Sequence, residues 1–356
     1  MKKNILAVAI AGAMVAPLAA NAAAPTLYGQ MNIAVDSVSE NGNAVVNRNS
    51  RLGLKGSEDL GNGLKAVYQF ETTLNANGSG NGFGGQRNTF VGVAGGFGTV
   101  FAGRHDTPLR MIQPSDRFND SAYLGNNTGR FGGLNVDAGT GDESFKANIS
   151  GEDRLDNMVA YISPKFNDFQ VIIGGVSTTS SGKNDQAIGN AYSASLAYGS
   201  KRSGLFAAVG LTQRTDKLDT TTRAANSSAT PPITGQKITE VQNTRAVVQY
   251  SADGLVVSAM YNAVDAKEIK ASTATTLGAA YTMGAFTPKA KVSMVNYGLD
   301  EAKDSTNYAI GLDYALGKKT RAVVEYGVLD KNNLAGANFN AGKSTDVFTV
   351  GLHHAF

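Results

Sequence analysis

The chain has 356 residues, of which 42% are hydrophobic and 17% charged, and its formal net charge is +3. It has no Cys, no Trp and only three His residues, which excludes a disulfide scaffold, a Cys-ligated metal and a thiol nucleophile, and argues against a multi-His metal cage. A net charge this small also argues against a nucleic-acid binder.

The first 22 residues have the features of a secretory signal peptide. Lys2 and Lys3 precede an uncharged stretch from Ile5 to Leu18, and Ala20-Asn21-Ala22 places small residues at the two positions that a signal peptidase reads. A membrane anchor is the alternative, which Pro17 disfavours. We therefore expect cleavage after Ala22 and export of a single domain that comprises residues 23–356.

The exported part alternates apolar and polar residues over short segments. Leu64, Ala66, Tyr68 and Phe70 are apolar or aromatic, and mostly polar residues separate them. Because neighbouring side chains of a β-strand face opposite sides, such a segment has one apolar and one polar face. After the first 22 residues no run approaches the ~20 apolar residues that a spanning helix needs. The same period of two recurs at 245–250, 289–294 and 307–314.

Turn signals divide these segments in a regular way. Seven short turns, rich in residue types that accept the backbone of tight hairpins, alternate with eight longer polar stretches, so together they join sixteen strands. The short turns are at 60–63, 95–98, 164–168, 199–203, 251–254, 283–285 and 317–319. The longer loops are at 38–48, 75–86, 105–153, 177–190, 215–243, 265–273, 299–306 and 331–345.

Alternating strands fit either a soluble sandwich or barrel, or a barrel that spans a membrane. One rim of short turns and one of long loops is typical of outer-membrane barrels, and a tilted ten-residue strand spans ~25 Å, the height of their apolar band. A packed sandwich core could not hold the charges on the polar faces unpaired, whereas a water-filled lumen can. The pattern therefore predicts an all-β, sixteen-stranded antiparallel transmembrane barrel with an apolar outside and a polar inside. The charges in question are Lys65, Glu71, Arg87, Arg245, Lys289, Lys291, Arg321 and Glu325.

Aromatic residues mark the strand ends and the end of the chain. Trp is absent, so we expect Tyr to form the interfacial girdles of the barrel. Apolar residues recur at every second position up to the last residue, in the pattern of a closing strand with one lipid-facing side. The tail residues are Phe348, Val350, Leu352 and Phe356, and the girdle candidates are Tyr28, Tyr68, Tyr161, Tyr198, Tyr250, Tyr261, Tyr281, Tyr314 and Tyr326.

The exported chain resembles the general porins of Gram-negative bacteria, in particular the β-proteobacterial, neisserial-type subgroup. The resemblance rests on Leu27-Tyr28-Gly29, on the run from Ser50 to Gly56, on Glu58 to Ala66, on Asp116 to Ser121 and on Val350 to Phe356. Two His residues stand in the tail where the family often has Arg or Lys, from which we expect no loss of function. The resemblance implies a homotrimer through which ions and small hydrophilic solutes diffuse. It also implies that the tail is the signal that the barrel-assembly machinery recognises and that outer-membrane lipid, including lipopolysaccharide, surrounds the barrel.

The longest loop, 105–153, is the third long loop, and by the same resemblance it folds into the lumen and forms the constriction. An extracellular flap is the alternative for this loop. The resemblance also implies a cluster of wall arginines opposite loop acids, which would create a transverse field. Because basic candidates outnumber acidic ones, we expect a weak preference for anions. The basic candidates are Arg51, Arg87 and Arg154, then Arg104, Lys55 and Lys65, and the acidic candidates are Asp106, Asp116 and Asp120.

Two other function classes remain open: a barrel enzyme, for which His105 is the only His residue away from the tail, and an adhesin or receptor that uses its outer loops. Gly80–Gly85 and Ala337–Ser344 imitate nucleotide-binding loops, but no helix pattern follows either one. His353 and His354 would face opposite sides of a strand and cannot share a metal. We therefore expect no catalytic site, cofactor, metal or nucleic-acid partner.

Overall fold

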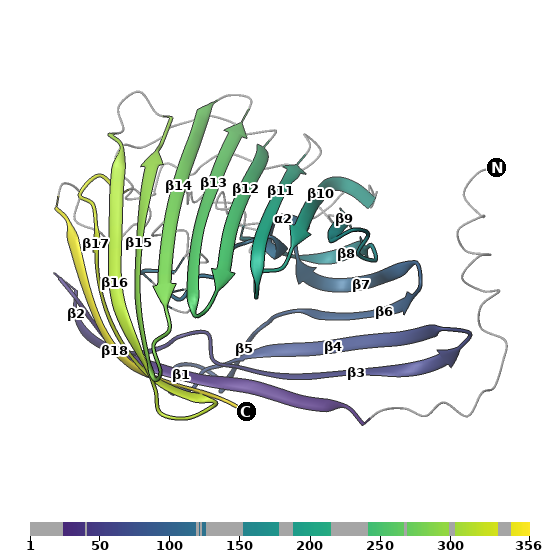
Figure 1. Ribbon diagram of the computed structural model, residues 1–356, viewed down its shortest axis with the longest axis horizontal. Coiled ribbons are helices and arrows are strands. Elements are labelled where there is room, and N and C mark those ends of the chain that lie inside the picture. The colour runs from purple at the N-terminus through teal and green to yellow at the C-terminus, as the bar shows by residue number, and fades with distance from the viewer. Residues whose placement is uncertain are drawn as a thin grey trace.

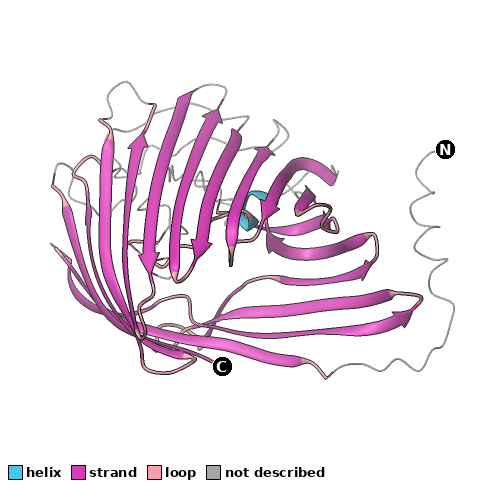
Figure 2. Ribbon diagram, in the orientation of Figure 1, coloured by secondary structure: helices cyan, strands magenta, loops and turns pink. Residues whose placement is uncertain are grey.

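The computed structural model describes residues 24–39, 41–118, 121, 123–125, 152–177, 188–214, 241–266, 269–298, 303–333 and 343–356. The predicted signal peptide and Asp120 lie outside these residues, as does a large part of the loop 105–153. Within the described ranges the structure has β-strands and one short helix, α2 (Pro108–Met111), and no helix long and apolar enough to cross a membrane. Figure 2 shows this helix in cyan among the strands.

The described part of the chain has eighteen strand segments, which together build one barrel wall (Figure 1). Their bounds are β1 (Thr26–Val38), β2 (Gly42–Asn47), β3 (Arg51–Gly61), β4 (Leu64–Leu74), β5 (Phe83–Gln86), β6 (Thr89–Gly95), β7 (Gly98–Asp106), β8 (Arg154–Ile162), β9 (Phe169–Ser177), β10 (Ile188–Gly199), β11 (Gly204–Arg214), β12 (Val241–Ala252), β13 (Leu255–Ala266), β14 (Ile269–Tyr281), β15 (Phe286–Asn296), β16 (Ser305–Ala315), β17 (Thr320–Leu329) and β18 (Thr345–Ala355).

Eighteen segments make sixteen wall strands because two strands are interrupted. β2 and β3 pair with successive parts of β1, and β5 and β6 pair with successive parts of β4. At the first break the Ser50 hydroxyl accepts a hydrogen bond from the Asn32 amide and donates one to the Asn32 carbonyl, so it replaces lost ladder bonds. All pairings are antiparallel, and β18 pairs with β1 to close the barrel, as Figure 1 shows where yellow meets purple. The predicted closed barrel of sixteen strands is confirmed.

The seven predicted short turns all join consecutive strands. Asn62 and Asp253 have left-handed backbone angles, with φ of 51° and 49°, as tight hairpins require. Three predicted long loops are shorter than expected, because 38–48 contains β2, 75–86 contains β5, and only residues 267–268 separate β13 from β14. Polar, Gly-rich segments are poor strand formers in isolation, and here the neighbouring strand recruits them into the wall.

The burial pattern along the strands is the reverse of that in a soluble protein, because polar side chains are buried and apolar side chains are exposed. On β12 the polar side chains Asn243, Arg245 and Gln249 are buried, whereas Val248 and Tyr250 are about half exposed. The polar face therefore points to the inside of the barrel and the apolar face to the outside, as predicted.

The tail and most of the Tyr candidates lie on the outer face. Of the nine Tyr candidates, Tyr28 alone is a clear exception, because it shares the inward face of β1 with the buried Gln30 and donates a hydrogen bond to Glu71. His353 is buried and His354 exposed, so the two face opposite sides as expected. On the outer face the large exposed side chains of the tail are Phe348, Val350, Leu352 and Phe356, and six exposed Tyr candidates are Tyr198, Tyr250, Tyr261, Tyr281, Tyr314 and Tyr326.

Candidate functional site: a basic lumen

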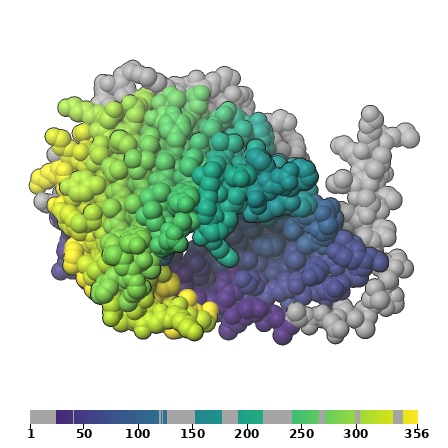
Figure 3. Space-filling model, viewed as in Figure 1, coloured from purple at the N-terminus to yellow at the C-terminus, as the bar shows by residue number. Residues whose placement is uncertain are grey.

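Inside the barrel is a polar cavity of about 940 Å³. The surface is visibly hollowed between the green-to-teal strands and the purple-to-blue strands (Figure 3). Its described lining holds eight Lys or Arg residues against three acids, which makes it strongly basic. The basic residues are Arg51, Arg87, Arg110, Arg117, Arg154, Lys201, Arg202 and Arg321, and the acids are Glu71, Asp106 and Asp116.

Glu71 organises the first group of wall charges. It lies on the inward face of β4, opposite Gly53, and accepts a hydrogen bond from the Arg87 guanidinium at 2.5 Å. Arg51 lies 4.0 Å from the same carboxylate, and the Tyr28 hydroxyl donates to it at 2.9 Å. A Cβ at Gly53 would clash with the Tyr28 ring, so the glycine allows this ring to lie flat on the wall. The predicted wall residues Arg51 and Arg87 therefore share one buried counter-ion.

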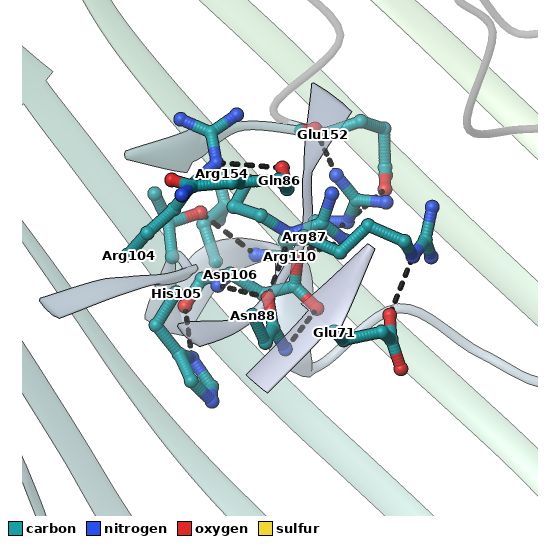
Figure 4. Close-up of polar contacts among 12 residues, drawn as sticks. Glu71, Gln86, Arg87, Asn88, Arg104, His105, Asp106, Arg110, Glu152 and Arg154 are labelled. Atoms are coloured by element: carbon teal, nitrogen blue, oxygen red, sulfur yellow. Dashed lines mark hydrogen bonds and ion pairs between the residues drawn. The ribbon is translucent and has the colours of Figure 1, made fainter. Parts of the chain in front are cut away.

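Asn88 and Asp106 organise the second group, in which Arg154 is the third predicted wall arginine (Figure 4). The Arg154 side chain forms an ion pair with Asp106 at 2.9 Å and donates to the Asn88 amide oxygen at 2.6 Å. Asn88 donates in turn to Asp106 at 3.2 Å, and Arg110 pairs with the same carboxylate at 3.2 Å. The predicted loop acid Asp106 is thus the counter-ion of the wall arginines and does not lie across the lumen from them.

The other predicted basic residues lie elsewhere. Arg104 is not part of the described cavity lining, because it has the same parity on β7 as the exposed Val100 and Ala102. It pairs instead with Asp156, at 2.6 Å, and the Asp156 side chain is 51% exposed. Lys55 lies on the inward face of β3 with its ammonium 5.0 Å from the centroid of the Tyr28 ring. Lys65 also faces inward, opposite Asp59, but near the short-turn rim and away from the cavity lining.

The beginning of the third long loop follows the inner wall. Thr107 caps α2, and its hydroxyl accepts a hydrogen bond from the Arg110 amide. Leu109 and Ile112 are 1% exposed and pack on inward-facing apolar residues of β11, β12 and β13. The Leu109 carbonyl accepts a hydrogen bond from Arg245, whose guanidinium also pairs with Glu152 at 2.5 Å. Both ends of the loop are therefore fastened to one buried arginine of β12.

Further along, the loop contacts the far side of the barrel. Ser115 bonds to Gln249 of β12, and the Asp116 carboxylate pairs with Lys291 of β15 at 2.9 Å. Phe118 and Leu124 are buried in a cluster with Val38, Ala309, Leu329 and Val347. The side chains of Asp116 and Lys291 are only 5% and 2% exposed, so this predicted loop acid is neutralised against the wall. The third predicted loop acid, Asp120, lies outside the described residues.

Several lumen residues were not predicted: Tyr28, Asn88, Arg110, Arg117, Lys201 and Arg202. One signal for the wall breaks is present in the sequence, since Arg48-Asn49-Ser50 and Arg87-Asn88-Thr89 repeat the pattern Arg-Asn-Ser/Thr at the two interruptions. Such irregularities commonly re-aim side chains. Lys201 lies in the short turn after β10 and donates to the Met111 carbonyl at 2.8 Å. Burial, together with Arg245, lowers the pKa of Lys201 to about 8.

A barrel with an apolar outside and a water-accessible, charged inside defines the class of outer-membrane diffusion channels. The Gram-negative porin model matches residues 7–334, so the chain belongs to the Gram-negative porin family. It is 30% identical to the major outer membrane protein P.IB of Neisseria lactamica, over 100% of both chains. It is also 30% identical to the protein of that name from Neisseria gonorrhoeae, over 92% of this chain and 94% of the relative. The chain is therefore an outer-membrane porin.

Solved porin structures have the same fold. An anion-selective porin from Comamonas acidovorans superposes with a TM-score of 0.68 at 22% identity, covering 94% of this chain and 99% of that one. OmpF of Salmonella typhi, in complex with daunomycin, superposes with a TM-score of 0.67 at 15% identity and covers 93% of this chain and 97% of that one.

Among the residues that the structure describes, no group of three or more His, Asp or Glu side chains could hold a metal ion.

Proposed function

We propose that this porin prefers anions. The observation that supports the proposal most is the described lining of the cavity, where eight basic residues face three acids and each acid already has a basic partner. Fixed charge of one sign in a confined aqueous passage raises the local concentration of counter-ions. The Comamonas acidovorans porin, which is similar in fold, is itself anion-selective.

The lumen is narrowed by the third long loop, 105–153. The contacts of its described parts support this, because they extend from α2 on β11 and β12 to Asp116 on β15 and Leu124 beside Gly327 of β17. An extracellular flap would not bond to inward-facing side chains. The aperture then lies between these loop residues and the wall that carries Arg51, Arg87 and Arg154.

The working form is a homotrimer in outer-membrane lipid and lipopolysaccharide. A solved porin from Vibrio cholerae, OmpT, which is similar in fold, is described as a trimer form. Residues 1–22 act as the cleaved export signal, and Phe348, Val350, Leu352 and Phe356 act as the signal for the barrel-assembly machinery. The outward direction of all four tail side chains supports that role, because it leaves them accessible on one face.

The protein works as a channel without catalytic chemistry and without a cofactor. His105, the candidate base, packs against the rings of Phe90 and Phe101 at 5.2 and 4.7 Å between centroids, and its Nδ1 lies 2.9 Å from the Asp106 carbonyl oxygen. A general base needs instead a nucleophile within hydrogen-bond reach. Of the long loop 215–243, one of the outer loops that an adhesin or receptor could use, residues 215–240 lie outside the described residues.

Reversal potentials in a planar bilayer under a KCl gradient test the anion preference. The unaltered protein should give the sign of an anion-preferring pore, and Arg51→Ala combined with Arg154→Ala should move the potential toward zero. A cation-type potential, or no change in the double variant, would refute the proposal. Swelling of liposomes in sugars of graded size measures the aperture in the same preparation.

A further inference from the structure

Residues 116–118 meet the wall in an alternating way. The Asp116 side chain is 5% exposed and pairs with Lys291, and Phe118 is 2% exposed. Arg117, between them, is exposed and lines the 940 Å³ cavity. The segment therefore fixes two side chains to the wall and turns the third into the water of the lumen.

Lys289 of β15 holds this segment by its backbone. Its ammonium donates hydrogen bonds to Glu325 at 2.6 Å and to the Arg117 carbonyl at 3.1 Å, and it forms an ion pair with Asp313 at 2.6 Å. Because Asp313 belongs to β16 and Glu325 to β17, the carbonyl of Arg117 is tied to a network that spans three wall strands.

The Phe118 ring covers the same lysine and its neighbour. The Lys289 and Lys291 ammonium groups lie 4.6 and 5.3 Å from the ring centroid, within the range of cation–π attraction. Asp116 supports the arrangement from the other side, since one carboxylate oxygen accepts from Lys291 at 2.9 Å and the other from the Phe118 amide at 2.9 Å. A pocket of about 20 Å³, space for about one water molecule, lies between this segment and β13, β14 and β15.

We propose that Arg117 is a specificity-determining residue of the pore, and that Lys289, Lys291 and Phe118 are the positioning residues that present it to passing anions. The clamp, as we name these three residues, explains why two inward-facing lysines are withdrawn from the lumen while an arginine of the loop is not. Among the described residues Arg117 forms no ion pair, so its charge acts on solutes in the cavity. Only the measurement of ion selectivity rests on the proposed channel function; the measurement of the position of the loop does not.

The first experiment measures selectivity. Arg117→Ala should lower the anion-to-cation permeability ratio at least about two-fold, because it removes one fixed charge from the water-filled passage. Lys318→Met, which removes a charge from the exposed turn after β16, should leave the ratio unchanged. Phe118→Leu keeps every ion pair of Lys289 and loses only the ring, so it tests the clamp with little risk to folding. It should lower the ratio in the native background and produce no further change in the Arg117→Ala background.

The second experiment measures the position of the loop without any current. The chain has no cysteine, and a Cβ placed on Gly327 would lie 2.5 Å from the Leu124 side chain. Leu124→Cys with Gly327→Cys should therefore form a disulfide on mild oxidation, more slowly when Phe118→Leu or Lys289→Met is added and at an unchanged rate with Arg117→Ala.

An unchanged permeability ratio in Arg117→Ala overturns the role of Arg117. The positioning role is overturned if Phe118→Leu changes the permeability ratio equally in the native and the Arg117→Ala backgrounds. It is also overturned if Phe118→Leu and Lys289→Met do not alter the rate of disulfide formation. If the unaltered protein does not conduct, the proposed channel function fails, whereas the disulfide rates still decide whether the clamp holds the loop.

Discussion

Glu71 is the acid whose removal should change selectivity most clearly. Its side chain is 10% exposed, it pairs with Arg87 at 2.5 Å, and it lies 4.0 Å from Arg51. Glu71→Gln keeps the size of the side chain and one oxygen, which can still accept the hydrogen bond that Arg87 donates to Oε1, while the Tyr28 hydroxyl, which donates to Oε2, can turn to accept one from the new amide NH2 group. It removes one negative charge from the lining and leaves the two arginines without their counter-ion, so the preference for anions should rise.

The size of the effect follows from the medium through which the charge acts. Two unit charges 4 Å apart interact by about 1 kcal/mol in bulk water and by about 4 kcal/mol at the effective dielectric constant near a protein surface. An ion in transit is surrounded by water in a 940 Å³ cavity, so the lower figure applies. About 1 kcal/mol corresponds to a factor of about five in local ion concentration, and salt screening reduces it. We expect the anion-to-cation permeability ratio to rise about two- to five-fold.

The assay is the reversal potential of single channels under a ten-fold KCl gradient, repeated at higher salt, where the difference between the variant and the unaltered protein should shrink. Glu58→Gln is the matched control, because Glu58 lies on neighbouring β3 with the opposite parity from Lys55 and outside the described lining of the cavity. Both variants change the net charge of the protein equally. If Glu71→Gln leaves the ratio unaltered, or if Glu58→Gln raises it as much, the assignment of Glu71 to the selective passage is wrong.

Three further predictions concern pH, stability and assembly. Because the pKa of Lys201 is lowered to about 8, its ammonium is charged at pH 7 and loses its proton as the pH rises to 9; the anion preference should fall over that interval, and Lys201→Met should abolish the fall. Glu152→Gln leaves the fully buried Arg245 without its carboxylate and should lower the free energy of unfolding by about 3 kcal/mol, measured by urea titration of the detergent-solubilised barrel. Phe356→Ala removes the ring that covers Gly29 at the barrel seam, and the yield of heat-modifiable, folded protein in the outer membrane should drop several-fold; an unchanged yield would contradict the assembly role.

The wall of the barrel could be predicted from the sequence because its determinants are local. A period of two and a turn rich in Gly, Asn or Asp each span only a few residues, and the direction of Phe348 or Lys65 follows from parity alone. The interruptions at Arg48 and Arg87 could not be predicted in the same way. There the strand continues only because β1 and β4 supply partners for β2 and β5, and that pairing is a tertiary effect.

The site could be predicted only where parity or resemblance is sufficient. Arg51, Arg87 and Arg154 all line the cavity, whereas Arg104 differs from the neighbouring His105 by one position and faces the other way. For Asp116 the residue type shows the charge but not its partner, which is 175 residues away on β15. The positions of the side chains in a long loop depend on contacts between residues this far apart in the sequence, and a periodic pattern of apolar residues does not reveal such contacts.

The long-range bonds of the loop also set an order for folding. The segment that begins at Ser115 must wait for Gln249, 134 residues later in the chain, and for Lys291, which is later still. Contacts so distant in sequence form late, since much chain entropy is lost before they can be made. A barrel in which the last hairpins have not yet joined would therefore lack the loop contact to Lys291 and the pairing of β18 with β1, and its lumen would be wide and unselective until both have formed.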